Sequence, residues 1–120
     1  MLDLDDFKKI NDNLGHITGD KVLREVAEII RGSLRKNDIA GRYGGEEFLI
    51  IFPQTSIKDA SEVCENIRRK VESKYQSSNI KLTISGGLAV YKEGNAHHLI
   101  DQADAKLYEA KNSGKNKILF

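Results

Sequence analysis

The order of helical and β-prone segments constrains the fold of this chain more than any other feature. Apolar residues recur at every third or fourth position in three long stretches, 20–34, 56–75 and 96–112. This spacing predicts three helices that each bury one face. A shorter helix is expected at 6–13. The β-prone runs lie around these stretches, at 2–5, 39–43, 47–52, 81–91 and 117–120.

The resulting order, β-α-α-β-β-α-β-α-β, predicts an α+β fold with a central mixed or antiparallel sheet and flanking helices on one face, of the split-βαβ type. We expect Thr18 or Asp20 to cap the first long helix. Gly44 and Gly45 predict a tight hairpin with a type I′ turn, because that turn needs positive φ at both central positions. The length of 120 residues fits one domain, residues 1–120, against about 150 for an average domain.

The composition excludes several classes of protein. With 19 Lys and Arg against 18 Asp and Glu, the net charge is +1, so the chain lacks the uniform positive field of a nonspecific nucleic-acid binder. Its only cysteine, Cys64, cannot form an internal disulfide, and no Cys/His cluster has zinc spacing. A cytoplasmic location is therefore expected. No apolar run approaches the roughly 20 residues of a membrane span, and we expect no membrane contact by this segment.

Carboxylates gather in two places that a hairpin sheet can bring together. Asp3, Asp5 and Asp6 end the first β-prone run, and Glu46 and Glu47 follow the paired glycines. Acidic side chains on opposed strand ends suit Mg²⁺, which takes one or two carboxylates and completes its shell with water and substrate phosphates. Each cluster alone is more typical of a solvated acidic loop. Together, on opposed elements, they indicate a metal site.

Two further features have both a structural and a phosphate-binding interpretation. Gly44 and Gly45 serve the turn, but they would also let a phosphate approach the backbone, because no Cβ lies in the way. Lys111 and Lys115 lie around the end of the last long helix. Cations at this place complement the helix dipole, or they contact a phosphate.

Four blocks of sequence, in order along the whole chain, resemble one protein family. They are similar to the GGDEF-domain diguanylate cyclases, in the GGEEF form, and this resemblance implies a palm-like sheet, ferredoxin-like and related to those of adenylyl cyclases and polymerases. The blocks are Phe7-Lys8-Lys9-Ile10-Asn11-Asp12, Gly15-His16 with Gly19-Asp20, Arg42-Tyr43-Gly44-Gly45-Glu46-Glu47-Phe48, and Ala103-Asp104 with Tyr108-x-Ala110-Lys111-x-x-Gly114-Lys115-Asn116.

The resemblance also implies a reaction, a cofactor and partners. Two GTP molecules would condense to cyclic di-GMP and two pyrophosphates, as each ribose 3′-hydroxyl attacks the α-phosphate of the other GTP. The active unit would be a homodimer, because one protomer holds one GTP. Two Mg²⁺ ions per half-site, or Mn²⁺, would stabilise the attacking and leaving oxygens. The full-length protein would carry an upstream sensor domain.

Carried over residue by residue, the resemblance assigns the metal site to the carboxylates of Asp3 and Glu46, with the carbonyl of Leu4. Glu47 is the other acidic catalytic candidate. The resemblance leaves open whether one of these carboxylates or a metal-bound hydroxide takes the 3′ proton.

The substrate contacts carry over in the same way. Asn11 and Asp20 match the guanine-reading pair, and a carboxylate at 20 accepts from guanine N1–H and N2–H₂, whereas adenine presents an acceptor at N1. Asp20 therefore favours GTP over ATP. At position 115 the family often has Arg, and Lys keeps the charge but loses the bidentate fork. The remaining substrate contacts are the backbone N–H groups of Phe7 and Lys8, Arg42, Gly44, Gly45, Lys111 and Lys115.

Residues 35–38 form an RxxD sequence that ends six positions before the paired glycines. In the family this offset marks an inhibitory site, where Arg35 and Asp38 would bind the product cyclic di-GMP. An ion pair at a helix end is the structural alternative. The family's supporting arginine falls at Asn66, with Arg68 and Arg69 nearby.

The front of the chain departs from the family pattern. A helix with a DxLTGLxNR-like signature and most of the first strand usually precede this region, and we expect this chain to be a catalytic domain that lacks them. The expected function is a diguanylate cyclase with product inhibition, weakly active or inactive as an isolated fragment. The alternative is a non-catalytic module that binds GTP or cyclic di-GMP.

Overall fold

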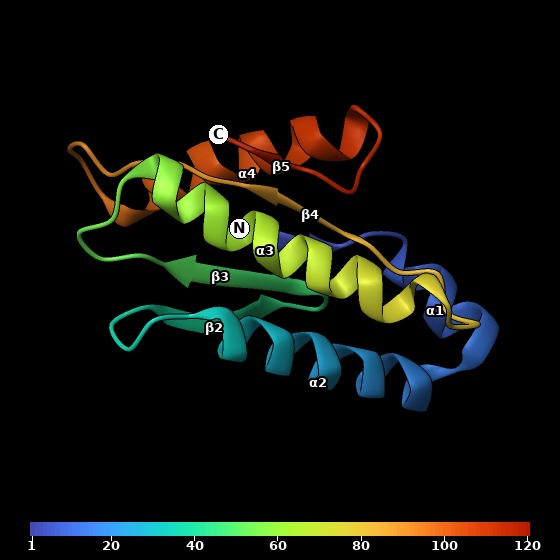
Figure 1. Cartoon of the computed structure of the whole chain (residues 1–120). Helices are drawn as coiled ribbons and strands as arrows, with labels where there is room; N and C mark the ends of the chain where they lie inside the picture. The colour runs from blue at the N-terminus through green and yellow to red at the C-terminus, as the bar shows by residue number, and fades with distance from the viewer.

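The computed structural model describes residues 1–120, which form five strands and four helices. Figure 1 shows their arrangement around one sheet. The strands are β1 (Leu2–Leu4), β2 (Ile39–Gly44), β3 (Glu47–Ile51), β4 (Ile84–Gly87) and β5 (Ile118–Leu119). The helices are α1 (Phe7–Leu14), α2 (His16–Ser33), α3 (Ile57–Gln76) and α4 (Ala96–Asn112).

The sheet has the order β2-β3-β1-β4-β5, so the short strand β1 lies at its centre. β1 is antiparallel to β3 and to β4, and β4 is parallel to β5. The connection from β3 through α3 to β4 therefore passes over β1. This is the expected split-βαβ arrangement in a mixed sheet, and the predicted α+β class is confirmed.

The helices cover both faces of the sheet, so the expectation of helices on one face is wrong. On one face Leu2, Leu4 and Ile84 pack in the main core, with side chains of α2 and α3. On the other face Met1 packs with residues of α4. In Figure 1, α3 passes in front of the strands. Helical spacing identifies which side of a helix is apolar, but it does not say which face of a sheet that side covers.

Gly87 brings α4 into direct contact with the sheet. A Cβ atom at this position would lie 2.1 Å from the carbonyl oxygen of Ala103 and 2.2 Å from the backbone nitrogen of Leu107. Only glycine lets the two backbones approach so closely. The position of α4 over β4 is therefore fixed by backbone contact.

The helix boundaries differ from the prediction at the start of α2. The helix begins at His16 rather than after Thr18 or Asp20, and Gly15 precedes it with φ 87°. Glycine adopts this conformation without strain, so α2 starts directly where α1 ends. None of the helices is long and apolar enough to cross a membrane.

The hairpin between β2 and β3 is real, but its turn is not type I′. β2 continues through Gly44, and the register shifts between Arg42 and Gly44. Neither Gly44 nor Gly45 has a positive φ, which a type I′ turn requires. Instead Arg42 Nε donates to the carbonyl oxygen of Gly45 at 2.8 Å. An irregular pairing braced by a side chain replaces the ideal turn.

Candidate active site

The hairpin turn lies beside the end of the central strand. Asp3 is opposite Glu47 in the β1–β3 register, and the backbone N–H of Leu4 donates to the carbonyl oxygen of Glu46 at 3.2 Å. Two segments more than 40 positions apart thus meet at one edge of the sheet. The structure brings together the three carboxylates that the sequence analysis proposed as catalytic.

Lys111, at the end of α4, joins this acidic cluster. Its Nζ lies 2.6 Å from Oδ1 of Asp3 and 2.7 Å from Oδ1 of Asp5. The side chain of Asp5 is only 3% exposed. Since buried charges need partners, one ammonium group compensates two carboxylates that lie two residues apart on opposite sides of Leu4.

The crowding of charge alters the protonation equilibria of the cluster. Burial raises the pKa of Asp3, with Glu46 and Asp5 adding to the shift and Lys111 opposing it. Burial also raises the pKa of Glu47, together with the charges of Asp3, Asp104 and Glu46. For Lys111, burial works against the ammonium form, but its hydrogen bonds to Asp3 and Asp5 raise the pKa. The carboxylates of the cluster outnumber the ammonium group of Lys111, so a further cation would relieve their mutual repulsion.

A second lysine lies beside the first turn of α1. Lys115 Nζ is 2.8 Å from Oδ1 of Asp6, the residue that precedes this helix and has φ 56°. The first N–H groups of a helix, here those of Phe7 and Lys8, have no intrahelical acceptor and favour anions. A cation and a helix N-terminus are thus close enough together to receive one phosphate chain.

The predicted guanine-reading residues lie where α1 and α2 touch. A Cβ at Gly19 would lie 1.9 Å from Oδ1 of Asn11, so the Asn11 amide lies against the turn of α2 that carries Asp20. Asp20 is exposed and lines a groove of about 780 Å³ between α2 and β2, which Arg42 also lines. Asp3, Glu46, Glu47, Lys111 and Lys115 do not line this groove.

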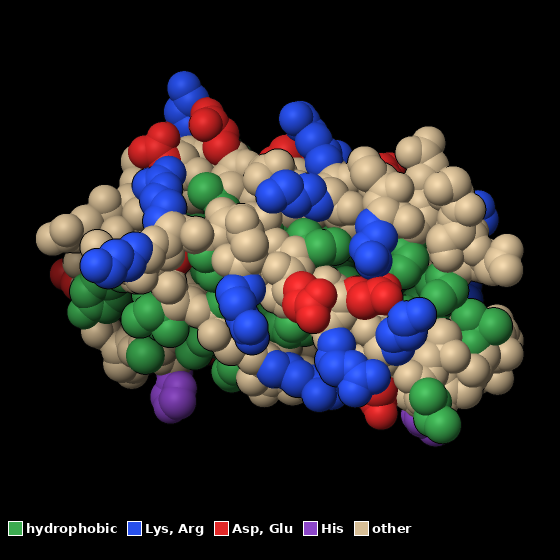
Figure 2. All heavy atoms as spheres, turned by 60° about the horizontal axis from the view of Figure 1, so that its bottom comes forward, with side chains coloured by type: hydrophobic (Ala, Val, Ile, Leu, Met, Phe, Trp, Pro, Cys, Tyr) green, Lys and Arg blue, Asp and Glu red, His purple; other side chains and the backbone are tan.

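The same groove reaches the RxxD sequence. Arg35 and Asp38 line it together with Arg24 and Arg31. The backbone N–H of Arg35 donates to Oδ2 of Asp38 at 2.8 Å, but no ion pair joins the two side chains. Figure 2 shows several Lys and Arg side chains around apolar surface on the side of the molecule where α2 lies. The structure thus contradicts the ion-pair alternative and leaves the Arg35 guanidinium free for a ligand.

The comparison with known sequences settles the family of the chain. A family model described as "Diguanylate cyclase, GGDEF domain" matches residues 1–117. The chain belongs to the GGDEF family.

Two relatives show how this GGDEF domain fits into larger proteins. It is 45% identical over 123 residues to Diguanylate cyclase A of Treponema denticola, and the match covers 98% of this chain and 33% of that protein. It is 40% identical over 126 residues to Diguanylate cyclase VdcA of Vibrio cholerae, covering 99% of this chain and 37% of that protein. The chain therefore spans about a third of the length of these relatives.

Solved structures confirm the GGDEF fold. The GGDEF domain of DgcB from Caulobacter crescentus, crystallised with c-di-GMP, matches with a TM-score of 0.89 and 38% identity, over 98% of this chain and 72% of that one. The diguanylate cyclase SiaD from Pseudomonas aeruginosa, in complex with its activator SiaC, matches with a TM-score of 0.90 and 38% identity. That match covers 99% of this chain and 48% of the other.

The donor set of this GGDEF domain fits a divalent cation that is bound together with its substrate. No group of three or more His, Cys, Asp or Glu side chains could hold a metal by itself. Mg²⁺ does not need one, because it binds one or two carboxylates and keeps water and substrate phosphates in its shell. Asp3 and Glu46 supply two oxygen-donor side chains at one place, which is sufficient for this kind of site.

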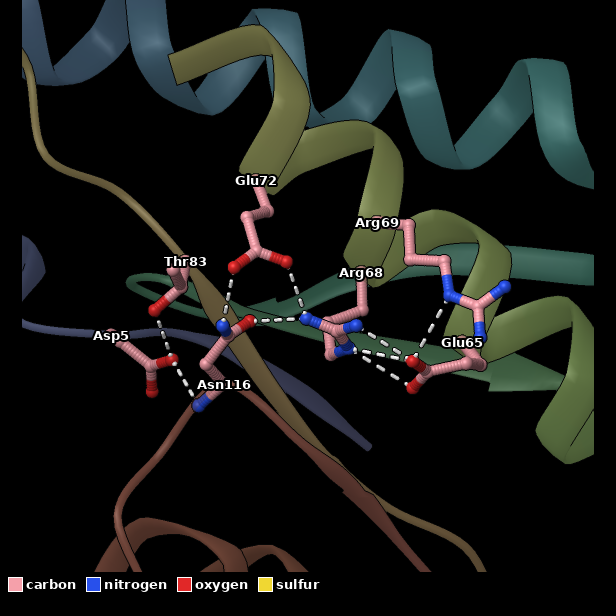
Figure 3. A network of polar contacts seen from close by, with 7 residues as sticks. All are labelled: Asp5, Glu65, Arg68, Arg69, Glu72, Thr83 and Asn116. Carbon is pink, nitrogen blue, oxygen red and sulfur yellow. Dashed lines mark hydrogen bonds and ion pairs between the residues drawn. The ribbon is translucent and has the colours of Figure 1, made fainter. Parts of the chain in front are cut away.

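Asp5 is the residue of the site that the sequence analysis underrated. Its carboxylate accepts from Thr83 Oγ1 and Ser85 Oγ, both at 2.7 Å, and from the backbone N–H of Asn116 at 3.0 Å, in addition to Lys111. Figure 3 shows part of this network. One feature of the sequence could have identified Asp5. This residue directly follows the alternation of Leu2, Asp3 and Leu4 in β1, at the end of the central strand, where its side chain is buried.

The residues near the position of the family's supporting arginine have other roles. Asn66 is exposed. Arg68 is 13% exposed and pairs with Glu65 and Glu72, both at 2.7 Å. Arg69 pairs with Glu65 at 3.4 Å and is 71% exposed. Arg68 is thus fully engaged within the protein, whereas Arg69, three positions after Asn66, keeps most of its side chain exposed.

Proposed function

We propose that this domain condenses two GTP molecules into cyclic di-GMP with release of two pyrophosphates. The observation that carries the proposal is the meeting of Asp3, Glu46 and Glu47 at the end of β1, with Lys111 2.6 Å from Asp3. In each half-reaction a ribose 3′-oxygen forms a bond to the α-phosphorus of the other GTP. The bond from that phosphorus to pyrophosphate breaks, and the proton of the 3′-hydroxyl is released.

The carboxylates of Asp3 and Glu46, with the carbonyl of Leu4, would hold up to two Mg²⁺ ions, or Mn²⁺. These ions supply electrostatic stabilisation of the attacking and leaving oxygens. Asp5 retains Lys111 at 2.7 Å, so the ammonium group stays near the site when Asp3 takes another partner. Glu47 lies half-buried beside Asp3, and burial raises its pKa. It is therefore a candidate to accept the 3′ proton.

The positive groups around this cluster suit the triphosphate. Lys111 and Lys115 would contact the β- and γ-phosphates, and the first N–H groups of α1, from Phe7 and Lys8, would bind phosphate oxygens. Gly44 and Gly45 allow the phosphates to approach the hairpin backbone, and Arg42 braces that hairpin from within.

Asn11 and Asp20 would read the guanine base. Asp20 is exposed and free of ion pairs, so its carboxylate is available to accept from guanine N1–H and N2–H₂. Since one chain provides one such base site, the new bonds form between two GTP molecules held by two protomers. The active unit is therefore a homodimer, acting in the cytoplasm, where GTP is available.

The groove between α2 and β2 would bind the product as an inhibitor. Arg35 and Asp38 line it at the end of α2, and Arg24 and Arg31 line it further along the helix. A cyclic dinucleotide carries two phosphodiester charges, and free guanidinium groups bind phosphate through paired hydrogen bonds. The longer relatives support the view that a further domain of the full-length protein controls this activity.

The test is an assay of the purified chain with GTP and Mg²⁺ across a range of protein concentrations, with cyclic di-GMP and pyrophosphate quantified by chromatography and mass spectrometry. A rate per protomer that rises with protein concentration supports a cyclase that works as a dimer. GTP binding without product at any concentration would favour the non-catalytic module. Absence of product, together with no binding of either GTP or cyclic di-GMP, would reject both functions.

A further inference from the structure

The turn after α4 has an unusual backbone. Gly114, Lys115 and Asn116 are three consecutive residues with positive φ, at 111°, 61° and 48°. Glycine tolerates this region, but Lys and Asn do so at a cost that surrounding contacts must offset. This turn carries Lys115, so its conformation decides where that side chain starts. It also directly follows the helix end that carries Lys111, whose ammonium group shares the Asp5 carboxylate with the backbone of the turn.

The side chain of Asn116 is held at both ends by α3. Its Oδ1 accepts from Arg68 Nη1 at 2.7 Å, and its Nδ2 donates to Oε1 of Glu72 at 2.9 Å. Arg68 is itself fixed, because it donates to Glu65 and to Oε2 of Glu72. Figure 3 shows the Glu72 carboxylate above the Asn116 amide and the Arg68 guanidinium beside it, both carried by α3. An arginine on α3 thus sets the orientation of a side chain in the turn.

The backbone of Asn116 connects the turn to the acidic cluster. Its N–H donates to Oδ2 of Asp5 at 3.0 Å, while Oδ1 of Asp5 accepts from Lys111 at 2.7 Å. The next residue back, Lys115, reaches Asp6 at 2.8 Å. A continuous series of hydrogen bonds therefore runs from Arg68 through Asn116 and Asp5 to Lys111.

We propose that Arg68 is a positioning residue for triphosphate binding, acting through Asn116 and Asp5 on Lys111 and Lys115. This inference rests on the proposed role of the two lysines as phosphate contacts. Arg68 touches no reacting group itself. It holds the left-handed turn in place, so that two flexible lysine side chains start from fixed positions and less conformational freedom is lost when a triphosphate binds.

Arg69 provides a matched control on the same helix. It is the neighbour of Arg68 in sequence and pairs with the same Glu65, but it is exposed and has no contact with Asn116. Replacing Arg69 removes one positive charge and one ion pair from α3 without touching the turn. An effect seen in Arg68→Gln but not in Arg69→Gln is then not due to the charge of the helix, and it points to the contacts of Arg68 with Asn116 and Glu72.

The experiment compares two ligands that differ in the phosphates the lysines would bind. Dissociation constants for 3′-deoxy-GTP, which cannot react, and for GMP are measured by NMR titration in Mg²⁺ for the native chain, Arg68→Gln and Arg69→Gln. We expect Arg68→Gln to weaken binding of 3′-deoxy-GTP about tenfold, equivalent to about 1.4 kcal/mol, and binding of GMP less than about twofold. Arg69→Gln should change neither. An equal loss for both ligands would overturn the proposal.

A second variant, Asn116→Gly, tests the proposal even if Arg68→Gln does not fold. Asn116→Gly keeps a residue that tolerates positive φ and keeps the N–H that Asp5 accepts, but it removes the link to Arg68. In a double-mutant cycle, Arg68→Gln combined with Asn116→Gly should weaken 3′-deoxy-GTP binding no more than the stronger single variant. Additive losses would show that Arg68 does not act through Asn116.

Lys111→Met separates this inference from the function on which it rests. If Lys111→Met leaves the ratio of the two dissociation constants unchanged, the assignment of Lys111 to the phosphates fails. If Lys111→Met changes the ratio but Arg68→Gln does not, only the positioning role of Arg68 fails.

Discussion

The acidic end of β1 and the groove between α2 and β2 handle charge in opposite ways. At the acidic end, Asp3, Asp5 and Lys111 are largely buried and paired with one another. In the groove, Arg35 is open and forms no ion pair. A charge that is already paired is positioned before a ligand arrives, whereas a free one is available but mobile. The comparison suggests that the first region is built for chemistry and the second for reversible binding.

The largest effect should come from removing a carboxylate at the acidic end. We expect Glu46→Ala to reduce the rate of cyclic di-GMP formation by about 100-fold or more, the loss typical of removing one group that stabilises transition-state charge. The far-ultraviolet circular dichroism spectrum should not change. Glu109→Gln, which alters an exposed carboxylate on α4, is the control and should keep the native rate. A native rate in Glu46→Ala would remove this residue from the site.

The two lysines should differ in their contribution to stability. Lys111→Met leaves the buried carboxylate of Asp5 without its cation, so we expect the free energy of unfolding in urea to fall by about 2 kcal/mol. Lys115→Met breaks a pair whose two side chains are about 40% exposed, and it should cost about 0.5 kcal/mol or less. Equal losses in the free energy of unfolding would mean that the buried pairing of Lys111 stabilises the fold no more than an exposed ion pair does.

In the groove, the expected effect is on inhibition. Arg35→Ala should raise the concentration of cyclic di-GMP that halves the rate about tenfold, a loss of about 1.4 kcal/mol of binding free energy. The reason is the loss of a charge-assisted contact to a phosphodiester. Lys106→Ala removes a partly exposed positive side chain on α4, far from the RxxD sequence, and should leave the inhibition curve in place. If both variants show the native curve, the RxxD sequence has no part in inhibition.

The smallest effect should be a change in stability with pH. The pKa of Glu47 is raised in the folded state by burial and by Asp3, so its stabilising contribution is present in acid and is lost as the pH rises through that pKa. Glu47→Gln should therefore raise the urea midpoint at pH 7 and leave it almost unchanged at pH 4.

Glu72 is the control of opposite sign. Its hydrogen bonds with Asn116 and Arg68 lower its pKa, so its contribution is present near neutral pH and is lost as the pH falls. Glu72→Gln should lower the midpoint at pH 7 and have less effect in acid. The same direction of shift in both variants at pH 7 would contradict this account of the acidic end.

Much of the fold follows from local patterns in the sequence. The apolar stripe of α3 and the alternation of Leu2 and Leu4 with Asp3 gave the correct elements, since periodicity records which side of an element is buried. The ideal turn at Gly44 was wrong, because Arg42 holds Gly45 in a way that glycine preferences do not reveal. The face covered by α4 could not be predicted, because it depends on the close approach at Gly87.

The residues of the site likewise divide into those that the sequence could identify and those that only the structure reveals. The motif residues Asp3 and Glu46 could be named from their positions, but the pairing of Asp3 with Lys111 joins residues 108 positions apart and is a property of the fold alone. The role of Asp5 was missed because its four hydrogen-bond donors come from separate segments. Arg68 was visible only as a neighbour of Asn66, and its contact with Asn116 appears only in three dimensions.

The backbone contact at Gly87 limits how the sequence of this domain can evolve. Lys111 follows Leu107 by one helical turn, about 5.4 Å along the axis. The spacing between α4 and the sheet is limited by main-chain atoms on both sides, so it does not depend on which apolar side chains fill the rest of the core. The core can therefore drift in sequence while the lysine keeps its distance from the central strand, provided that position 87 stays glycine.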